Sequence, residues 1–129
     1  MIVDITNEVL TRLITDFPTY TVVSEYPSIT PDFPMITVAE LSNVGDITTK
    51  DTGGFNYEII SLDINIFTNG SNRQSKAKEI RNEIDSILSD EYGMLRDFGG
   101  QTPNADTDIF RYTLRYTARV DANRTIYRG

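Results

Sequence analysis

The sequence predicts an α+β fold in which a mostly antiparallel sheet carries two helices packed on one face. Two long segments, 55–68 and 109–120, alternate apolar with polar residues, as strands with one buried face do. Two others, 4–16 and 72–90, repeat apolar residues at helical spacing. The expected order along the chain is α-β-β-β-α-β-β. We expect residues 1–129 to form a single domain, since the chain is too short for two ordinary ones.

The first quarter of the chain is predicted to be a helix, a short strand and an extended connector. Residues 4–16 form the helix, with Asp4 suited to the N-cap and Pro18 expected to stop it. A strand rich in β-branched residues follows at 20–25. The three prolines within 27–34 exclude both a helix and a central strand, so this stretch is expected to be extended and stiff.

A second strand is predicted at 35–41, and residues 42–54 are predicted to form a long hairpin loop that projects from the body. The loop is polar, contains glycines and offers almost nothing to a core. Loops of this length are usually either functional or disordered. We expect this one to be mobile in the free subunit and ordered only on assembly. Its candidate partner contacts are Asp46, Lys50 and Asp51.

The helix predicted at 72–90 has an unusual charge order. Its apolar stripe is expected to fix it on the sheet, but cations fill its first half and anions its second, which opposes the helix dipole. One explanation is a solvated face. The other is a bipolar strip that meets the opposite end of the same strip on a neighbouring subunit. The candidate interface residues on this helix are Arg73, Lys76, Arg81 and Asp85.

The last strand, 109–120, divides its residues between a core face and an arginine-rich face. It follows Gly93, which is expected to end the helix, a short strand at 94–98 and a polar turn region at 99–108. The candidate interface residues on its polar face are Arg111, Arg115 and Arg119.

Three interpretations of this arginine-rich face stay open. It is a solvated face paired across strands with Asp63 and Glu58, a nucleic-acid platform, or a subunit interface, where arginine is enriched. A nucleic-acid platform would need aromatic side chains on the same face, whereas those of this strand are expected to point into the core.

The residue types of most catalytic and metal sites are missing. The chain has no cysteine and no histidine, which excludes thiolate and imidazole chemistry, and it has no phosphate-binding motif. Acidic pairs such as Asp106 and Asp108 lie in turns, where aspartate is ordinarily a turn former. The net charge of −7 disfavours a protein that grips nucleic acid by its phosphates. We therefore expect no enzyme and no cofactor. No apolar run suits a membrane span, and no signal peptide is expected.

Three segments resemble a family of small structural proteins of long-tailed phages and prophages of Gram-positive bacteria. They are EYPSITPDFPMITVAELSN, ISLDINIFTNGSNRQSKAKEIRNEIDSIL and the tyrosine- and arginine-rich strand that closes in TIYRG. Members of the family are described as tail-terminator or tail-completion proteins, or loosely as minor capsid proteins. The resemblance covers most of the chain from about Ser24.

The resemblance implies a homo-oligomeric ring, a hexamer in the family, at the head-proximal end of the tail. Such a ring ends the growth of the tail tube protein, docks to the head-tail connector or stopper protein, and lets DNA pass without specific binding. It implies a place in the virion, and in the host cytoplasm during assembly. The bipolar helix and the arginine strand are candidate halves of the head-to-tail interface that a ring needs. The alternatives are a head-completion or stopper neck protein, a non-phage cytoplasmic binding module, and a nuclease or other enzyme.

Overall fold

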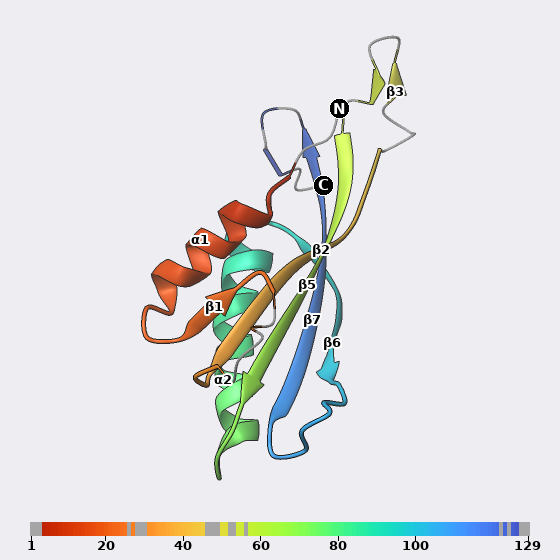
Figure 1. Ribbon diagram of the computed structural model, residues 1–129. Helices are drawn as coiled ribbons and strands as arrows, with labels where there is room; N and C mark the ends of the chain where they lie inside the picture. The colour runs from red at the N-terminus through yellow and green to blue at the C-terminus, as the bar shows by residue number, and fades with distance from the viewer. Residues whose placement is uncertain are drawn as a thin grey trace.

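The computed structural model describes most of the chain, in residues 4–25, 27, 31–45, 50–51, 54–55, 57–121, 123 and 125–126. It has the predicted α+β architecture, because a five-stranded, mostly antiparallel sheet carries both helices on one face (Figure 1). One hydrophobic cluster joins the helices to the sheet. Its buried members include Leu13 of the first helix, Ile80 of the second, and Ile64 and Leu114 of the central strands.

The strands of the main sheet lie in the order β1-β2-β5-β7-β6. In chain order, the elements are helix α1 (Thr6–Asp16), strands β1 (Thr21–Val23), β2 (Met35–Gly45), β3 (Lys50–Asp51), β4 (Gly54–Phe55) and β5 (Tyr57–Thr68), helix α2 (Arg73–Asp85), its π-helical extension η2 (Ser86–Glu91), and strands β6 (Leu95–Gln101) and β7 (Phe110–Asp121). β1 runs parallel to β2, and every other neighbouring pair in this sheet is antiparallel. Among the strands in the described part of the chain, β3 and β4 pair only with each other.

The register of the central strands decides which residues meet the helices. Ile64 of β5 lies opposite both Val38 of β2 and Leu114 of β7, and all three are fully buried. Residues directly opposite each other in antiparallel strands point to the same side of a sheet. We call this buried side the helix face. The opposite side is the arginine face, which is defined by Arg111, Arg115 and Arg119.

Two predicted strand ends fall short of the observed ones. The sequence predicts a strand over 35–41, but β2 continues to Gly45 because β5 is long enough to pair with it. Similarly, β6 runs through two glycines to Gln101, since β7 offers a partner along this stretch. The short β3–β4 pair falls within the predicted 42–54 loop except for Phe55, and it projects beyond the sheet (Figure 1). The observed order therefore has two short strands more than the predicted α-β-β-β-α-β-β.

The two helices begin and end differently from the simplest expectation. α1 begins at Thr6, and Asp4 caps it from one position further out than the N-cap, accepting a hydrogen bond from the Thr6 N–H at 2.8 Å. The second helix leaves the α-helical pattern in η2, where the Tyr92 N–H donates to the Ile87 carbonyl at 3.0 Å. Gly93 then ends it with φ 75°, a conformation that glycine adopts at little steric cost.

Candidate subunit interface

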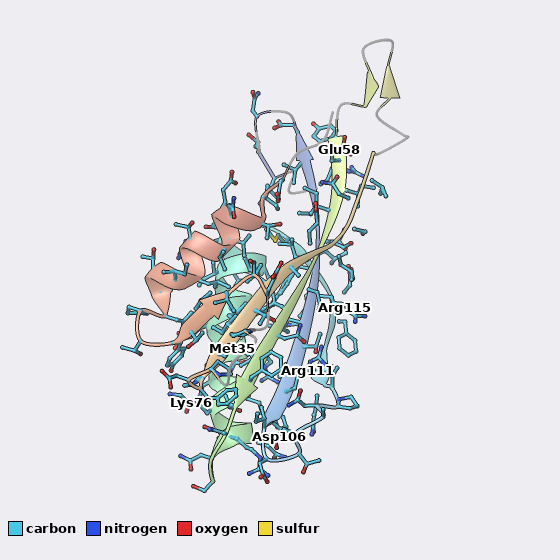
Figure 2. The ribbon with its side chains drawn as sticks, viewed as in Figure 1. Met35, Glu58, Lys76, Asp106, Arg111 and Arg115 are labelled. Carbon is cyan, nitrogen blue, oxygen red and sulfur yellow. The ribbon has the colours of Figure 1, made fainter. Side chains whose placement is uncertain are left out.

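The arginine face is the side of the sheet away from both helices, and two of its guanidinium groups contact side chains of β5. Arg115 pairs with Asp63, with 3.1 Å between Nε and Oδ1. Arg111 donates from Nε to Oδ1 of Asn65 at 2.9 Å. Figure 2 shows both arginines on this side. The predicted cross-strand pairing with Asp63 is therefore present.

Glu58 does not belong to the arginine face, which corrects the pairing expected for it. It lies opposite Val120 in the β5–β7 register, and Val120 is fully buried. Glu58 therefore points to the helix face, near the end of the sheet, and is only 3% exposed (Figure 2). Ile59, the next residue along, is the one that lies opposite Arg119. A difference of one residue along β5 is enough to move Glu58 to the helix face, because side chains along a strand alternate between faces.

Two aromatic rings lie on the arginine face, although the aromatic side chains of β7 do not. The Arg111 guanidinium carbon is 5.7 Å from the centre of the Phe67 ring, and that of Arg115 is 5.5 Å from Phe98. Both rings come from neighbouring strands, so the alternation within 109–120 could not predict them. Asp97 adds a second carboxylate to the face by accepting a hydrogen bond from the Thr117 hydroxyl. The face thus mixes cations, anions and apolar rings.

The charges of α2 fall on two sides of the helix. Lys76 lies over Tyr20, just before β1, with its Nζ 5.4 Å from the ring centre. Arg81 reaches the other way, donating from Nη1 to the Tyr112 hydroxyl of β7 at 3.2 Å. Arg73 donates to the Gly70 carbonyl at 3.1 Å, at the start of its own helix. The structure therefore does not bring the candidate residues of α2 together in one strip.

Asp85 turns inward and joins α2 to the sheet. Its Oδ1 accepts hydrogen bonds from the Tyr116 and Ser89 hydroxyls, each at 2.8 Å. Its Oδ2 is 3.1 Å from Nη1 of Arg96 in β6. Partial burial raises the pKa of the Asp85 carboxyl, but these donors outweigh burial and leave that pKa below its usual value. Burial, and then Asp85 itself, raises the pKa of Tyr116.

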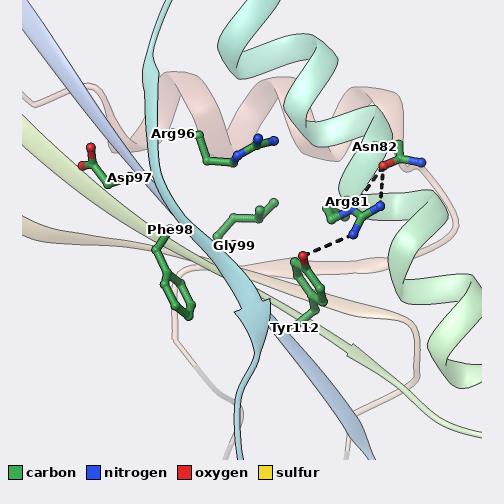
Figure 3. A pocket seen from close by; sticks show the side chains of 8 residues that line it. Arg81, Asn82, Arg96, Asp97, Phe98, Gly99 and Tyr112 are labelled. Carbon is green, nitrogen blue, oxygen red and sulfur yellow. Dashed lines mark hydrogen bonds between the residues drawn. The ribbon is translucent and has the colours of Figure 1, made fainter.

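A groove of about 470 Å³ lies between α2 and β6. Its lining includes Arg81, Asn82, Arg96, Gly99, Tyr112 and Leu114 (Figure 3). Arg81 donates from Nε and Nη2 to the Asn82 side-chain oxygen at 3.1 and 3.0 Å. Within the described parts of the chain, it forms no ion pair with a carboxylate. The lining therefore includes the guanidinium groups of Arg81 and Arg96 and the carboxylate of Asp97, and the Arg96 guanidinium is paired with Asp85.

The candidate contacts of the projecting loop are only partly described. Lys50 and Asp51 form β3, opposite Phe55 and Gly54. Asp46 lies outside the described residues, as does most of the stretch whose mobility the sequence predicts.

The described residues bring together no group of three Asp or Glu side chains that could hold a metal ion. Neither helix in these parts of the chain has the length and hydropathy that a membrane span requires. No protein-family model matches the sequence, and no curated protein matches it significantly.

Proposed function

We propose that this protein is a virion structural protein that forms a ring at the head-proximal end of a phage tail, where it ends tail-tube growth and joins the tail to the head. The observation that carries the proposal is the part of the arginine face around Arg115, where Asp63, Asp97 and the 40% exposed Phe98 gather without a helix to cover them. Arginine and aromatic residues are enriched at protein interfaces. The sequence resemblance to tail-terminator proteins gives this interface its place in the virion.

Two further features support the same proposal. The net charge of −7 suits a ring that DNA must slide through, because like charge repels the phosphates. The β3–β4 hairpin extends beyond the body of the subunit, which supports a contact with a ring above or below (Figure 1).

Deleting the gene from its phage tests the proposal. A tail tube grows by adding like subunits head to tail, an open assembly with no built-in stop. Electron micrographs of the mutant lysate should therefore show filled heads and separate tails, many of them longer than wild type. The wild-type gene supplied in trans should restore joined particles of uniform tail length.

Other outcomes of the deletion identify the alternatives. Empty heads beside tails of normal, uniform length would reject a terminator and favour a stopper on the head side. A fully infectious deletion mutant would reject both neck proteins and favour a function unrelated to the virion.

A further inference from the structure

The arginine face has a buried region of its own, which neither helix covers. Phe67 of β5 lies opposite both Met35 of β2 and Arg111 of β7, so the three side chains share this face. Met35 is fully buried and Phe67 is 5% exposed, yet neither belongs to the hydrophobic cluster that joins the helices to the sheet. Part of the arginine face is therefore a second, smaller interior.

The next row of this face is polar and almost as deeply buried. Thr37, Asn65 and Thr113 lie opposite one another on β2, β5 and β7, and their exposed fractions are 8%, 7% and 1%. A buried polar side chain is costly unless it has a hydrogen-bond partner, so most buried polar groups in proteins have one. Asn65 and Thr113 follow this rule, and Thr37 does not.

Asn65 is the centre of a network that holds Arg111 in place. Its Oδ1 accepts hydrogen bonds from Nε of Arg111 at 2.9 Å and from the Thr113 hydroxyl at 2.7 Å. Because Thr113 donates to Asn65, it accepts from the Thr102 hydroxyl, which is 2.6 Å away. Nη1 of Arg111 donates to the Pro103 carbonyl at 3.4 Å. Among the described residues, nothing accepts a hydrogen bond from Nη2, the other terminal nitrogen of this guanidinium.

Thr37 borders a pocket instead of a partner. Within the described part of the chain, its hydroxyl forms no hydrogen bond. A pocket of about 320 Å³ lies beside it, and its described lining is Ser24, Thr37, Ala39, Asn65, Phe67, Asn104 and Arg111. β1 pairs with β2 only as far as Thr37, so the outer half of β2 (39–45) pairs with β5 alone among the described strands. The pocket lies where this outer half begins, and the unpaired hydroxyl on its wall is available to a ligand.

Arg111 and Thr37 offer donors to the same space. The Arg111 side chain starts on β7, but its guanidinium lies over β5, where it contacts Asn65 and is 5.7 Å from the centre of the Phe67 ring. β5 is the neighbour of β2, which carries Thr37, and neighbouring strands are about 4.8 Å apart. One small group can therefore accept hydrogen bonds from both side chains.

The charges around the pocket suit one negative charge and not two. Arg111 is the only cation among the described lining residues, and no Asp or Glu is among them. Asp63, the next residue of β5 on this face, is paired with Arg115 and accepts a hydrogen bond from Asn65. Donors around a single cation match a carboxylate, whereas the second negative charge of a phosphate would have no cation to balance it.

We propose that this pocket is a binding site for a single carboxylate group, held by Nη2 of Arg111 and the Thr37 hydroxyl. The Phe67 ring and the Ala39 methyl group give it an apolar wall for the carbon atoms that bear the carboxylate. Its volume is at the small end of the range for ligand sites, which suits one acidic side chain of a partner protein or a small free carboxylate. The site lies within one subunit, so it does not depend on the proposed ring.

Titration of the isotope-labelled protein with two blocked amino acids tests the site by NMR. Acetyl-glutamate methylamide has one charge, its side-chain carboxylate, and acetyl-glutamine methylamide has nearly the same shape without it. The glutamate compound should shift the backbone amide signals of Thr37 and Asn65 and the Nε–H signal of Arg111, with a dissociation constant on the order of 1 to 10 mM. The glutamine compound should leave these signals in place, and inorganic phosphate should bind at least about tenfold more weakly.

Thr37→Val is the decisive variant, since valine keeps the branched shape and removes the hydroxyl. It should weaken binding of the glutamate compound about fivefold, as the loss of one hydrogen bond does, without lowering the stability of the protein. A hydroxyl with a structural role would show the reverse. Thr117→Val, on the same face but outside the pocket, should bind like wild type.

Arg111→Gln should abolish measurable binding by removing the cation, and Thr37→Val keeps the site testable if that variant fails to fold. Propionate identifies the source of the carboxylate. Equal affinity for propionate means that a small free carboxylate is sufficient, and tighter binding of the blocked glutamate favours a protein side chain, so either result supports the site. No shift of these signals, equal shifts with the glutamine compound, phosphate that binds as tightly as the glutamate compound, or binding unchanged by Thr37→Val would each overturn it.

Discussion

Asp85 is the residue at which a charge expected on the surface takes a structural role. It sits on α2 at the point where the helix approaches β7 and β6, and it binds Tyr116 and Arg96 from those strands. Helical spacing could not predict these contacts, because they depend on how distant segments pack. The same reasoning explains why Arg96 was absent from the predicted interface: it is a lone cation in a short strand, with nothing in the local pattern to single it out.

Replacing Asp85 with Asn should lower the free energy of unfolding by about 1 to 2 kcal/mol near neutral pH, because the hydrogen bonds to a charged acceptor are lost. The folded-state pKa of Asp85 lies below 3.8, the value of an aspartate carboxyl in an unfolded chain. Its stabilising effect is therefore complete above that value and is lost as the pH falls through the lower folded-state pKa. The free energies of unfolding of wild type and variant, measured in urea, should differ at pH 7 and become equal in strong acid. Glu83→Gln, an exposed change on the same helix, should show no such difference. A difference in the free energy of unfolding between wild type and Asp85→Asn that stays the same in acid would contradict the role of the carboxylate.

At the scale of elements, the spacing of apolar residues and the residue types typical of turns predicted most of the fold. The strand predicted at 109–120 is observed as Phe110–Asp121, because its strict alternation matches a half-buried strand. The strand at 94–98 is underestimated, because a Gly-Gly pair resembles a turn in sequence although β7 holds it extended. Nothing in the sequence predicted the π-helical turn of η2, since its apolar residues fit the α-helical stripe equally well.

Gly93 provides a test of how the second helix ends. Replacing it with Ala should cost about 1 kcal/mol or more, because its φ of 75° brings a Cβ close to the backbone. Gly99→Ala is the matched control, since the nearest atom to its new Cβ would be 3.4 Å away, an ordinary contact. Thermal unfolding should therefore show a larger loss of stability for Gly93→Ala than for Gly99→Ala. Equal losses would mean that the left-handed conformation is not the cause.

At the scale of the whole molecule, the strand order decides what a partner can meet. No local pattern predicts that β6 and the outer half of β2 are edges, because this follows from a parallel β1 and from pairings between distant segments. The alternation of side chains along the strand predicted at 109–120 did predict that the three arginines share a face. It could not predict which carboxylates and rings from other strands would join them there.

Reversing Arg115 to Glu tests whether the arginine face takes part in assembly. Its guanidinium is about half exposed in the pair with Asp63, and such pairs contribute up to about 1 kcal/mol, so folding should be affected only modestly. If the face contacts a neighbour, the oligomer should weaken far more than the subunit. Urea unfolding and sedimentation on the same preparation would measure the two effects. Oligomers of wild-type size from this variant would show that the face is merely solvated.

Both helices on one face also make the subunit a wedge. A helical layer adds about 10 Å of thickness to one side of a sheet and nothing to the other. Copies joined through their sheets must therefore curve away from the helices, which leaves the thicker layer on the outer circumference. In such an assembly, the bulk of the helices sets the width of the bore.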